Sequence, residues 1–143
     1  MFIQPYVWFD GRCEEAVTFY NGAIGAEIQM LMRQGETPDG TGRMPPGAEN
    51  KILHVTFRVG DSLIMASDGQ CGGNPTFKGI SLALSVADTP AAERAFAALG
   101  SGGKVEMPLT KTFFSPSFGI VVDRFGVTWM VSVAQAPADS SHS

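Results

Sequence analysis

The sequence lacks most features of secreted, membrane-bound and nucleic-acid-binding proteins. Only two cysteines occur among 143 residues, too few for the disulfide framework of a small secreted domain. No apolar run approaches the ~18 residues of a membrane span, and the first ten residues lack the basic flank of a signal peptide. With 10 basic and 14 acidic residues, the net charge of −4 offers no basic surface to phosphates. The composition predicts a cytoplasmic protein with neither a membrane nor a nucleic-acid partner.

Apolar residues are plentiful enough for one sizeable core, because 44% of the chain is hydrophobic and 17% is charged. Branched and aromatic runs predict strands, and a tight turn at residues 123–126 predicts a closing hairpin. The predicted strands span residues 3–9, 27–33, 52–59, 62–67, 80–86, 104–109 and the two arms of the hairpin at 117–133.

Two amphipathic helices are predicted from apolar residues spaced three and four apart. The first has Cys13, Val17, Tyr20 and Ile24 on its buried face. The second has Ala92, Ala95, Phe96 and Leu99, with Thr89 as its N-terminal cap and Pro90 at its first position.

The order strand, helix, three strands therefore occurs twice. A shift of 77 positions places Phe19 on Phe96 and Gly25 on Gly102, which indicates an internal repeat. The prediction is one domain over residues 1–135, with modules at 1–68 and 79–135, a linker at 69–78 and a small, polar, disordered tail at 136–143. The Gly- and Pro-rich stretch at 34–50 is expected to be a long loop, either a functional lid or simply the most mobile ordered segment.

Several stretches together resemble the PhnB-like branch of the glyoxalase/bleomycin-resistance/dioxygenase superfamily, also called vicinal oxygen chelate proteins. They are Tyr6-Val7-Trp8-Phe9, Ile52-Leu53-His54-Val55, Leu63-Ile64-Met65-Ala66-Ser67-Asp68 and Asp123-Arg124-Phe125-Gly126 with Trp129-Met130. The resemblance implies an α+β fold in which two βαβββ modules form half-barrels around a cavity, and it implies a homodimer. The branch often carries the label 3-demethylubiquinone 3-methyltransferase. The sequence does not support that activity, since it has no glycine-rich loop that opens a helix after a strand.

Metal-dependent members of this superfamily place His and Glu ligands at four strand positions. Carried over one at a time, these positions are Pro5, Met65, Ser81 and Met130, and a slip of one residue at any of them still gives no His, Asp, Glu or Cys. Divalent metals need such donors. The sequence therefore predicts no metal and no cofactor.

The residues expected to line the cavity are mostly aromatic and soft apolar side chains. They are Trp8, His54, Met65, Ser81, Phe114 and Met130. His54 is interpreted either as a proton acceptor at the cavity or, as the general rule favours, as a hydrogen-bonded histidine within a sheet. Cys13 is either a thiol activated at a helix start or a buried core residue.

Three functions fit these residues. The first is a metal-independent protein that binds a small, partly apolar molecule of unknown identity in the cavity. The second is an enzyme on the same scaffold, with His54 or a carboxylate as its base, in the manner of an isomerase, lyase, dioxygenase or transferase. The third is a structural homodimer whose cavity is filled by its own side chains. The fold alone does not decide among them, nor whether the protein is an enzyme.

Overall fold

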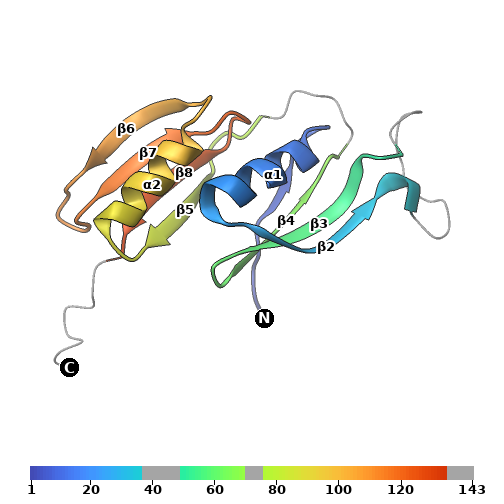
Figure 1. The fold of residues 1–143 in the computed structure, drawn as a ribbon, viewed down its shortest axis with the longest axis horizontal. Helices are drawn as coiled ribbons and strands as arrows, with labels where there is room; N and C mark the ends of the chain where they lie inside the picture. The colour runs from blue at the N-terminus through green and yellow to red at the C-terminus, as the bar shows by residue number, and fades with distance from the viewer. Residues whose placement is uncertain (37–48, 70–75, 135–143) are drawn as a thin grey trace. The chain divides into compact units, whose positions relative to one another are not determined.

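The computed structural model describes residues 1–36, 49–69 and 76–134, which belong to two compact units, Met1–Thr76 and Phe77–Ser143 (Figure 1). Each unit has one helix and one four-stranded sheet, in the chain order strand, helix, three strands. The α+β repeat predicted from the sequence is confirmed. Most of the predicted loop at 34–50, part of the linker at 69–78 and the tail at 136–143 lie outside the described residues.

The first unit contains sheet 1, with strand order β1-β4-β3-β2. Its elements are β1 (Tyr6–Trp8), α1 (Cys13–Ile24), β2 (Glu27–Arg33), the short 3₁₀ helix η1 (Gln34–Glu36), β3 (Ile52–Val59) and β4 (Ser62–Ser67). β1 pairs in parallel with β4, and the other pairs are antiparallel. The predicted start of the first strand at Ile3 is wrong, because the ladder with β4 begins where Tyr6 lies opposite Met65.

The second unit contains sheet 2, with strand order β5-β8-β7-β6. Its elements are β5 (Ser81–Val86), α2 (Thr89–Leu99), β6 (Lys104–Thr110), β7 (Phe118–Val122) and β8 (Thr128–Val133). The predicted cap at Thr89 is wrong: the Asp88 carboxylate accepts a hydrogen bond of 2.9 Å from the Ala91 amide, and Thr89 is already helical. An ionised carboxylate at this position also interacts favourably with the helix dipole.

In the first unit, α1 covers one face of sheet 1. The Tyr20 ring lies 6.2 Å, centroid to centroid, from the rings of both Phe9 and Phe57, and all three are buried. Because side chains alternate along a strand, His54 and Thr56 point to the opposite face from Val55 and Phe57. We call the face turned away from the unit's own helix the far face of its sheet.

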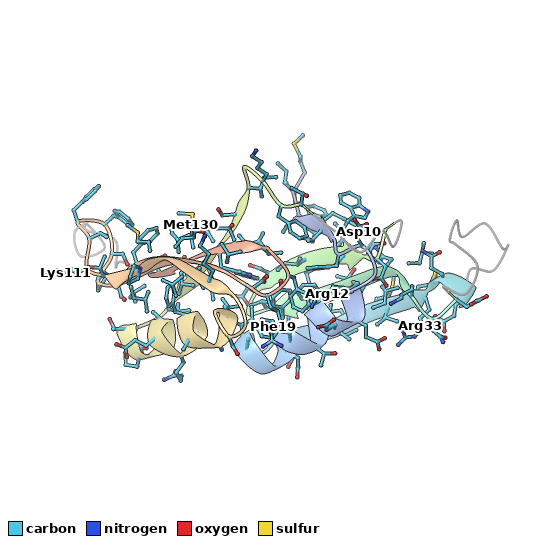
Figure 2. The ribbon with its side chains drawn as sticks, turned by 90° about the horizontal axis from the view of Figure 1, so that it is seen from above. Asp10, Arg12, Phe19, Arg33, Lys111 and Met130 are labelled. Carbon is cyan, nitrogen blue, oxygen red and sulfur yellow. The ribbon has the colours of Figure 1, made fainter. Side chains whose placement is uncertain are left out.

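In the second unit, the close approach of α2 to sheet 2 requires a glycine. A Cβ atom at Gly119 would lie 2.7 Å from Cε1 of Phe96, so no larger residue fits there. This contact places Gly119 on the face towards α2, and by alternation Phe118 and Ile120 lie on the far face. Met130 lies opposite Ile120 in the ladder and projects from the side of sheet 2 turned away from α2 (Figure 2).

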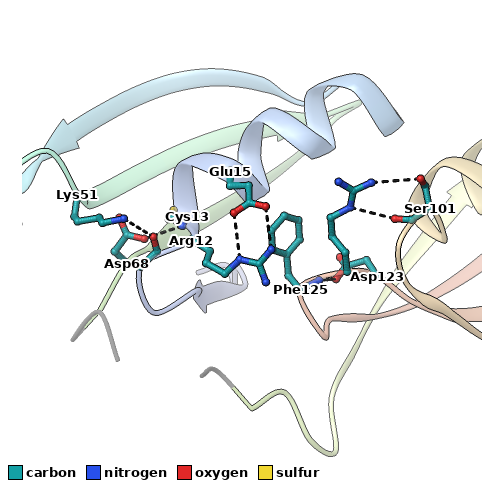
Figure 3. Close-up of polar contacts among 10 residues, drawn as sticks. Arg12, Cys13, Glu15, Lys51, Asp68, Ser101, Asp123 and Phe125 are labelled. Atoms are coloured by element: carbon teal, nitrogen blue, oxygen red, sulfur yellow. Dashed lines mark hydrogen bonds and ion pairs between the residues drawn. The ribbon is translucent and has the colours of Figure 1, made fainter. Parts of the chain in front are cut away.

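Two buried carboxylates, Asp68 and Asp123, accept hydrogen bonds from backbone amides where the chain changes direction (Figure 3). Asp68 accepts hydrogen bonds from the backbone amide of Cys13, at 2.7 Å, and from that of Ile52, at 2.6 Å. Asp123 accepts from the amides of Phe125 and Val127 within the turn. These two acids have structural roles, because their oxygens are committed to the protein's own donors.

Replacement of Asp68 should destabilise the protein strongly. We expect Asp68→Ala to lower the free energy of unfolding by about 2–4 kcal/mol, because two buried amides lose a charged acceptor. The matched control is Asp61→Ala, which removes an exposed carboxylate from the β3–β4 turn and should change the value by less than about 0.5 kcal/mol. Urea denaturation of both variants measures the difference, and equal effects would contradict the structural role of Asp68.

Candidate ligand-binding site

The far face of sheet 1 gathers aromatic, sulfur-containing and hydroxyl side chains from all four of its strands. One row of cross-strand neighbours runs from Tyr6 through Met65 and Thr56 to Met30. Trp8 follows Tyr6 by two residues on β1, and Met32 lies opposite His54. Three predicted site residues, Trp8, His54 and Met65, therefore share one face.

The rings of Tyr6 and Trp8 form the most prominent feature of this face. Their centroids are 4.8 Å apart at an interplanar angle of 37°, and the Tyr6 ring is 5.5 Å from the imidazole of His54. Trp8 is 55% exposed although it lies on an ordered strand. An exposed indole held by a neighbouring ring offers a flat apolar surface for a ligand.

Hydrogen bonds link three side chains beside these rings. The Tyr6 hydroxyl lies 3.0 Å from Nδ1 of His54, and Nε2 of His54 lies 3.0 Å from Oγ1 of Thr56. The hydrogen-bonded sheet histidine favoured by the sequence is thus present, with both ring nitrogens engaged. Burial raises the pKa of the Tyr6 phenol, an effect that the Ser67 hydroxyl partly opposes, so Tyr6 is a neutral hydroxyl at physiological pH.

Sequence reasoning omitted Met30, Met32 and Thr56 from the site. Alternation from His54 identifies Thr56 as its same-face neighbour, so that signal was present. The positions of the two methionines depend on the register between β2 and β3, which shifts between Ile28 and Met30. No local pattern in the sequence fixes such an irregularity.

The other three predicted residues lie in the second unit. Ser81 and Met130 are on the far face of sheet 2, since Ser81 lies opposite Thr128 and Met130 opposite Ala83. Phe114 lies in the loop between β6 and β7, which begins at Lys111 (Figure 2), and its ring is 5.0 Å from that of Phe118. The six candidates thus form one group in each unit, and their sharing of a single cavity remains a prediction.

The four positions that would hold a metal do not fit one. The cross-strand neighbours of Met65 are Tyr6 and Thr56, and Met130 is flanked by Ala83 and Ile120. Across residues 1–36, 49–69 and 76–134, no three His, Cys, Asp or Glu side chains gather where they could hold an ion. Thioether, hydroxyl and proline positions do not replace the imidazole and carboxylate ligands of a hard divalent metal.

Paired βαβββ units of this kind define the glyoxalase/bleomycin-resistance/dioxygenase class of fold. The glyoxylase/bleomycin resistance protein/dioxygenase domain from Frankia sp. EAN1pec superposes with a TM-score of 0.65 at 14% identity, covering 94% of this chain and 98% of that one. The family model described as 3-demethylubiquinone-9 3-methyltransferase matches residues 2–132. The chain belongs to this family, the PhnB-like branch of the superfamily.

Relatives with higher identity span nearly the whole chain. Protein YjdN of Escherichia coli strain K12 is 34% identical over 140 residues, covering 93% of this chain and 95% of YjdN. Protein PA1353 from Pseudomonas aeruginosa is 39% identical, with a TM-score of 0.82 and coverage of 95% and 99%. The PhnB protein from Bacillus cereus is 29% identical, with a TM-score of 0.77 and coverage of 94% and 100%.

In the described part of this chain, no helix is long and apolar enough to cross a membrane.

Cys13 is a core residue rather than an activated thiol. Its side chain is fully buried at the start of α1, and burial raises the pKa of its thiol far above the usual value, with further contributions from the Asp68 and Glu14 carboxylates. We expect a Cys71→Ser variant, whose only thiol is Cys13, to react with a disulfide reagent at about pH 8 far more slowly when folded than in guanidinium chloride. A rapid reaction of the folded protein would contradict this assignment.

Divalent metals should leave the stability of the protein unchanged. A ligand that binds only the folded state raises the melting temperature, so excess Zn²⁺, Ni²⁺ or Mn²⁺ should produce no shift, and neither should EDTA. Met130→Glu, which adds one carboxylate at a position that corresponds to a ligand of metal-dependent members, should behave like the wild type because it has no partner ligands. About one ion per chain in untagged protein, lost on chelation with a fall in melting temperature, would overturn the prediction that the protein binds no metal.

Proposed function

We propose that this protein binds a small, partly apolar molecule without a metal, and that the ligand lies against the far face of sheet 1. The observation that carries the proposal is the Tyr6–Trp8 ring pair beside the hydrogen-bonded chain of Tyr6, His54 and Thr56. Ligand sites typically combine apolar and aromatic walls with a few polar groups that fix orientation.

The far face is not needed to form the core of the first unit. That core lies on the other face, where α1 packs its buried side chains against Phe9, Val55 and Phe57. A face that met only solvent would carry mainly charged or small polar residues, whereas on this face Trp8 is 55% exposed. Such an apolar surface suits a ligand or a second chain, and the hydrogen-bonded chain of Tyr6, His54 and Thr56 beside it favours a ligand.

Methionines supply the remaining apolar surface of the face. Met65 lies between the Tyr6 and Thr56 positions, and Met30 continues the row on β2, where it is 48% exposed. Thioether side chains are flexible and polarisable, and they pack favourably against aromatic rings. Such a surface adapts to a ligand while the backbone beneath it stays fixed.

An enzymatic role has less support from the same residues. The three acids near strands are all engaged: Glu27 with Arg58 at 2.7 Å, Asp68 with two amides, and Glu106 with Lys104 at 3.4 Å. His54 has both nitrogens in hydrogen bonds. A general base needs a nitrogen or oxygen that reaches the substrate directly. We do not propose the methyl transfer named in the family description either, because the sequence has no glycine-rich loop that opens a helix after a strand.

The proposal includes a cytoplasmic homodimer. Both β2 and β6 are edge strands, and each exposes two apolar side chains. Ile28 and Met30 are 52% and 48% exposed, and Val105 and Met107 are 50% and 39% exposed. Unpaired edges with apolar side chains favour pairing with a second chain.

Native mass spectrometry of the purified protein tests this function. We expect a dimer that carries a compound of low mass and no metal, and release of that compound on denaturation. Trp8→Leu should lose the compound, since the ring platform is gone. The matched control Phe113→Leu removes an aromatic side chain that is 94% exposed in the second unit, and it should retain the compound. A bare wild-type dimer that also takes up none of a library of small aromatic and aliphatic compounds would leave the structural homodimer as the function.

A further inference from the structure

We infer that the ligand of this face is a planar aromatic or heteroaromatic molecule that bears one hydrogen-bonding group and no negative charge. This inference rests on the proposed function and adds the chemical class of the ligand. Three observations carry it: the ring pair, the free end of the hydrogen-bond chain at Thr56, and the distribution of charge around Trp8.

The ring pair selects for a flat ligand. The Tyr6 ring supports the indole of Trp8 from one side at 4.8 Å, and Trp8 remains 55% exposed. Offset stacking on an indole strengthens binding by about two- to twelvefold beyond the effect of the area that it buries, and a saturated ring of the same size does not gain this contribution. The platform thus favours an aromatic ligand over an aliphatic one of similar size.

The hydrogen-bond chain presents a group that can act as donor or acceptor. If Nε2 of His54 carries the proton, it donates to Thr56 Oγ1, and the threonine hydroxyl is left to donate to a ligand. If Nδ1 carries the proton, the Thr56 hydroxyl donates to Nε2, and its oxygen is left to accept. Tyr6 is compatible with both tautomers, because its hydroxyl oxygen accepts from a protonated Nδ1 and its O–H donates to an unprotonated Nδ1. Depending on which ring nitrogen carries the proton, Thr56 can therefore match either a carbonyl or ring nitrogen, or a hydroxyl or N–H group.

The charges on this face disfavour an anion. Around Gly69, a Cβ atom would meet Cδ1 of Trp8 at 3.0 Å and Oδ1 of Asp10 at 3.3 Å, so a carboxylate borders the indole. Towards the β3–β4 turn, the guanidinium of Arg58 is paired with Glu27 at 2.7 Å and is largely neutralised. A ligand stacked on Trp8 therefore has the Asp10 carboxylate as a neighbour, and this negative charge repels an anionic ligand and accepts a neutral one.

The test follows the indole Nε1–H resonance of Trp8 in the ¹H–¹⁵N spectrum of the full chain. The protein has two tryptophans, and Trp8→Leu assigns the resonances. Trp129, which is buried and donates to Asp123 at 2.9 Å, is the internal reference. The probe is 1-naphthol. It is compared with decahydro-1-naphthol, which keeps the hydroxyl but loses the plane, and with 1-naphthoate, which keeps the plane but adds a negative charge.

We expect 1-naphthol to shift the Trp8 resonance and to bind up to about tenfold more tightly than either comparison compound. Thr56→Val should weaken 1-naphthol binding about fivefold and leave the binding of naphthalene unchanged, because only the hydroxyl contact is lost. Phe113→Leu should change neither. A merely structural role for Thr56 would weaken both compounds alike.

Other results would overturn the inference, and they separate it from the proposed function. Equal binding of decahydro-1-naphthol would refute the planar ligand, and tightest binding of 1-naphthoate would refute the charge assignment. If native mass spectrometry finds a bound compound while no probe moves Trp8, the binding function stands and the ligand class is wrong. If neither experiment detects binding, both are wrong. A Trp8 resonance that depends only on protein concentration would show that a second copy covers this face.

Discussion

The first unit depends on one buried carboxylate that joins three segments distant in sequence. Asp68 follows β4, and its two oxygens accept from the first amide of α1 and the first amide of β3. Each donor would otherwise be a buried, unpaired N–H group, at a cost of about 1–3 kcal/mol each. Since α1 and β3 both begin at these amides, the same interaction fixes the start of the helix that packs on sheet 1 and the start of the strand that carries His54. The geometry of the far face therefore follows from a contact on the other side of the sheet.

Local sequence patterns predicted most of the fold because its elements are locally consistent. The first and last residues predicted for β2, β3 and β4 from their apolar patterns are the ones that the structure shows. The predicted ends of elements were wrong where contacts outside the element's own pattern determine them. β1 begins at Tyr6 because its pairing with β4 begins there, and α2 is capped by Asp88 because the Asp88 carboxylate accepts from the Ala91 amide. A single sequence does not report either contact. The placement of Trp8, His54 and Met65 on strands was predicted for the same reason, whereas the positions of Met30 and Met32 depend on a bulged register.

The two units share a topology but differ in the chemistry of their far faces. In the first, aromatic rings and a histidine occupy positions on β1 and β3. In the second, the corresponding row carries Ala83, Met130 and Ile120, and its polar side chains are serines and threonines. The aromatic side chains there are Phe118 on β7 and, with its ring 5.0 Å away, Phe114 in the loop between β6 and β7, where Thr112 Oγ1 accepts from the amides of Phe114 and Ser115. The two units therefore have the same order of one helix and four strands, while the side chains of their far faces differ.

The absence of metal ligands and the presence of the hydrogen-bonded histidine have a common physical consequence. A metal site needs carboxylates or imidazoles with free lone pairs pointing into it, and it binds oxygen-rich or anionic ligands through the ion's positive charge. At the positions that correspond to the ligands of metal-dependent members, this protein has Pro5, Met65, Ser81 and Met130, none of which supplies that charge. The binding that we propose then relies on contacts that need no ion: dispersion against thioethers and rings, and single hydrogen bonds from hydroxyl groups. In that proposal His54 lies between the hydroxyls of Tyr6 and Thr56 and orients Thr56 through its hydrogen bond.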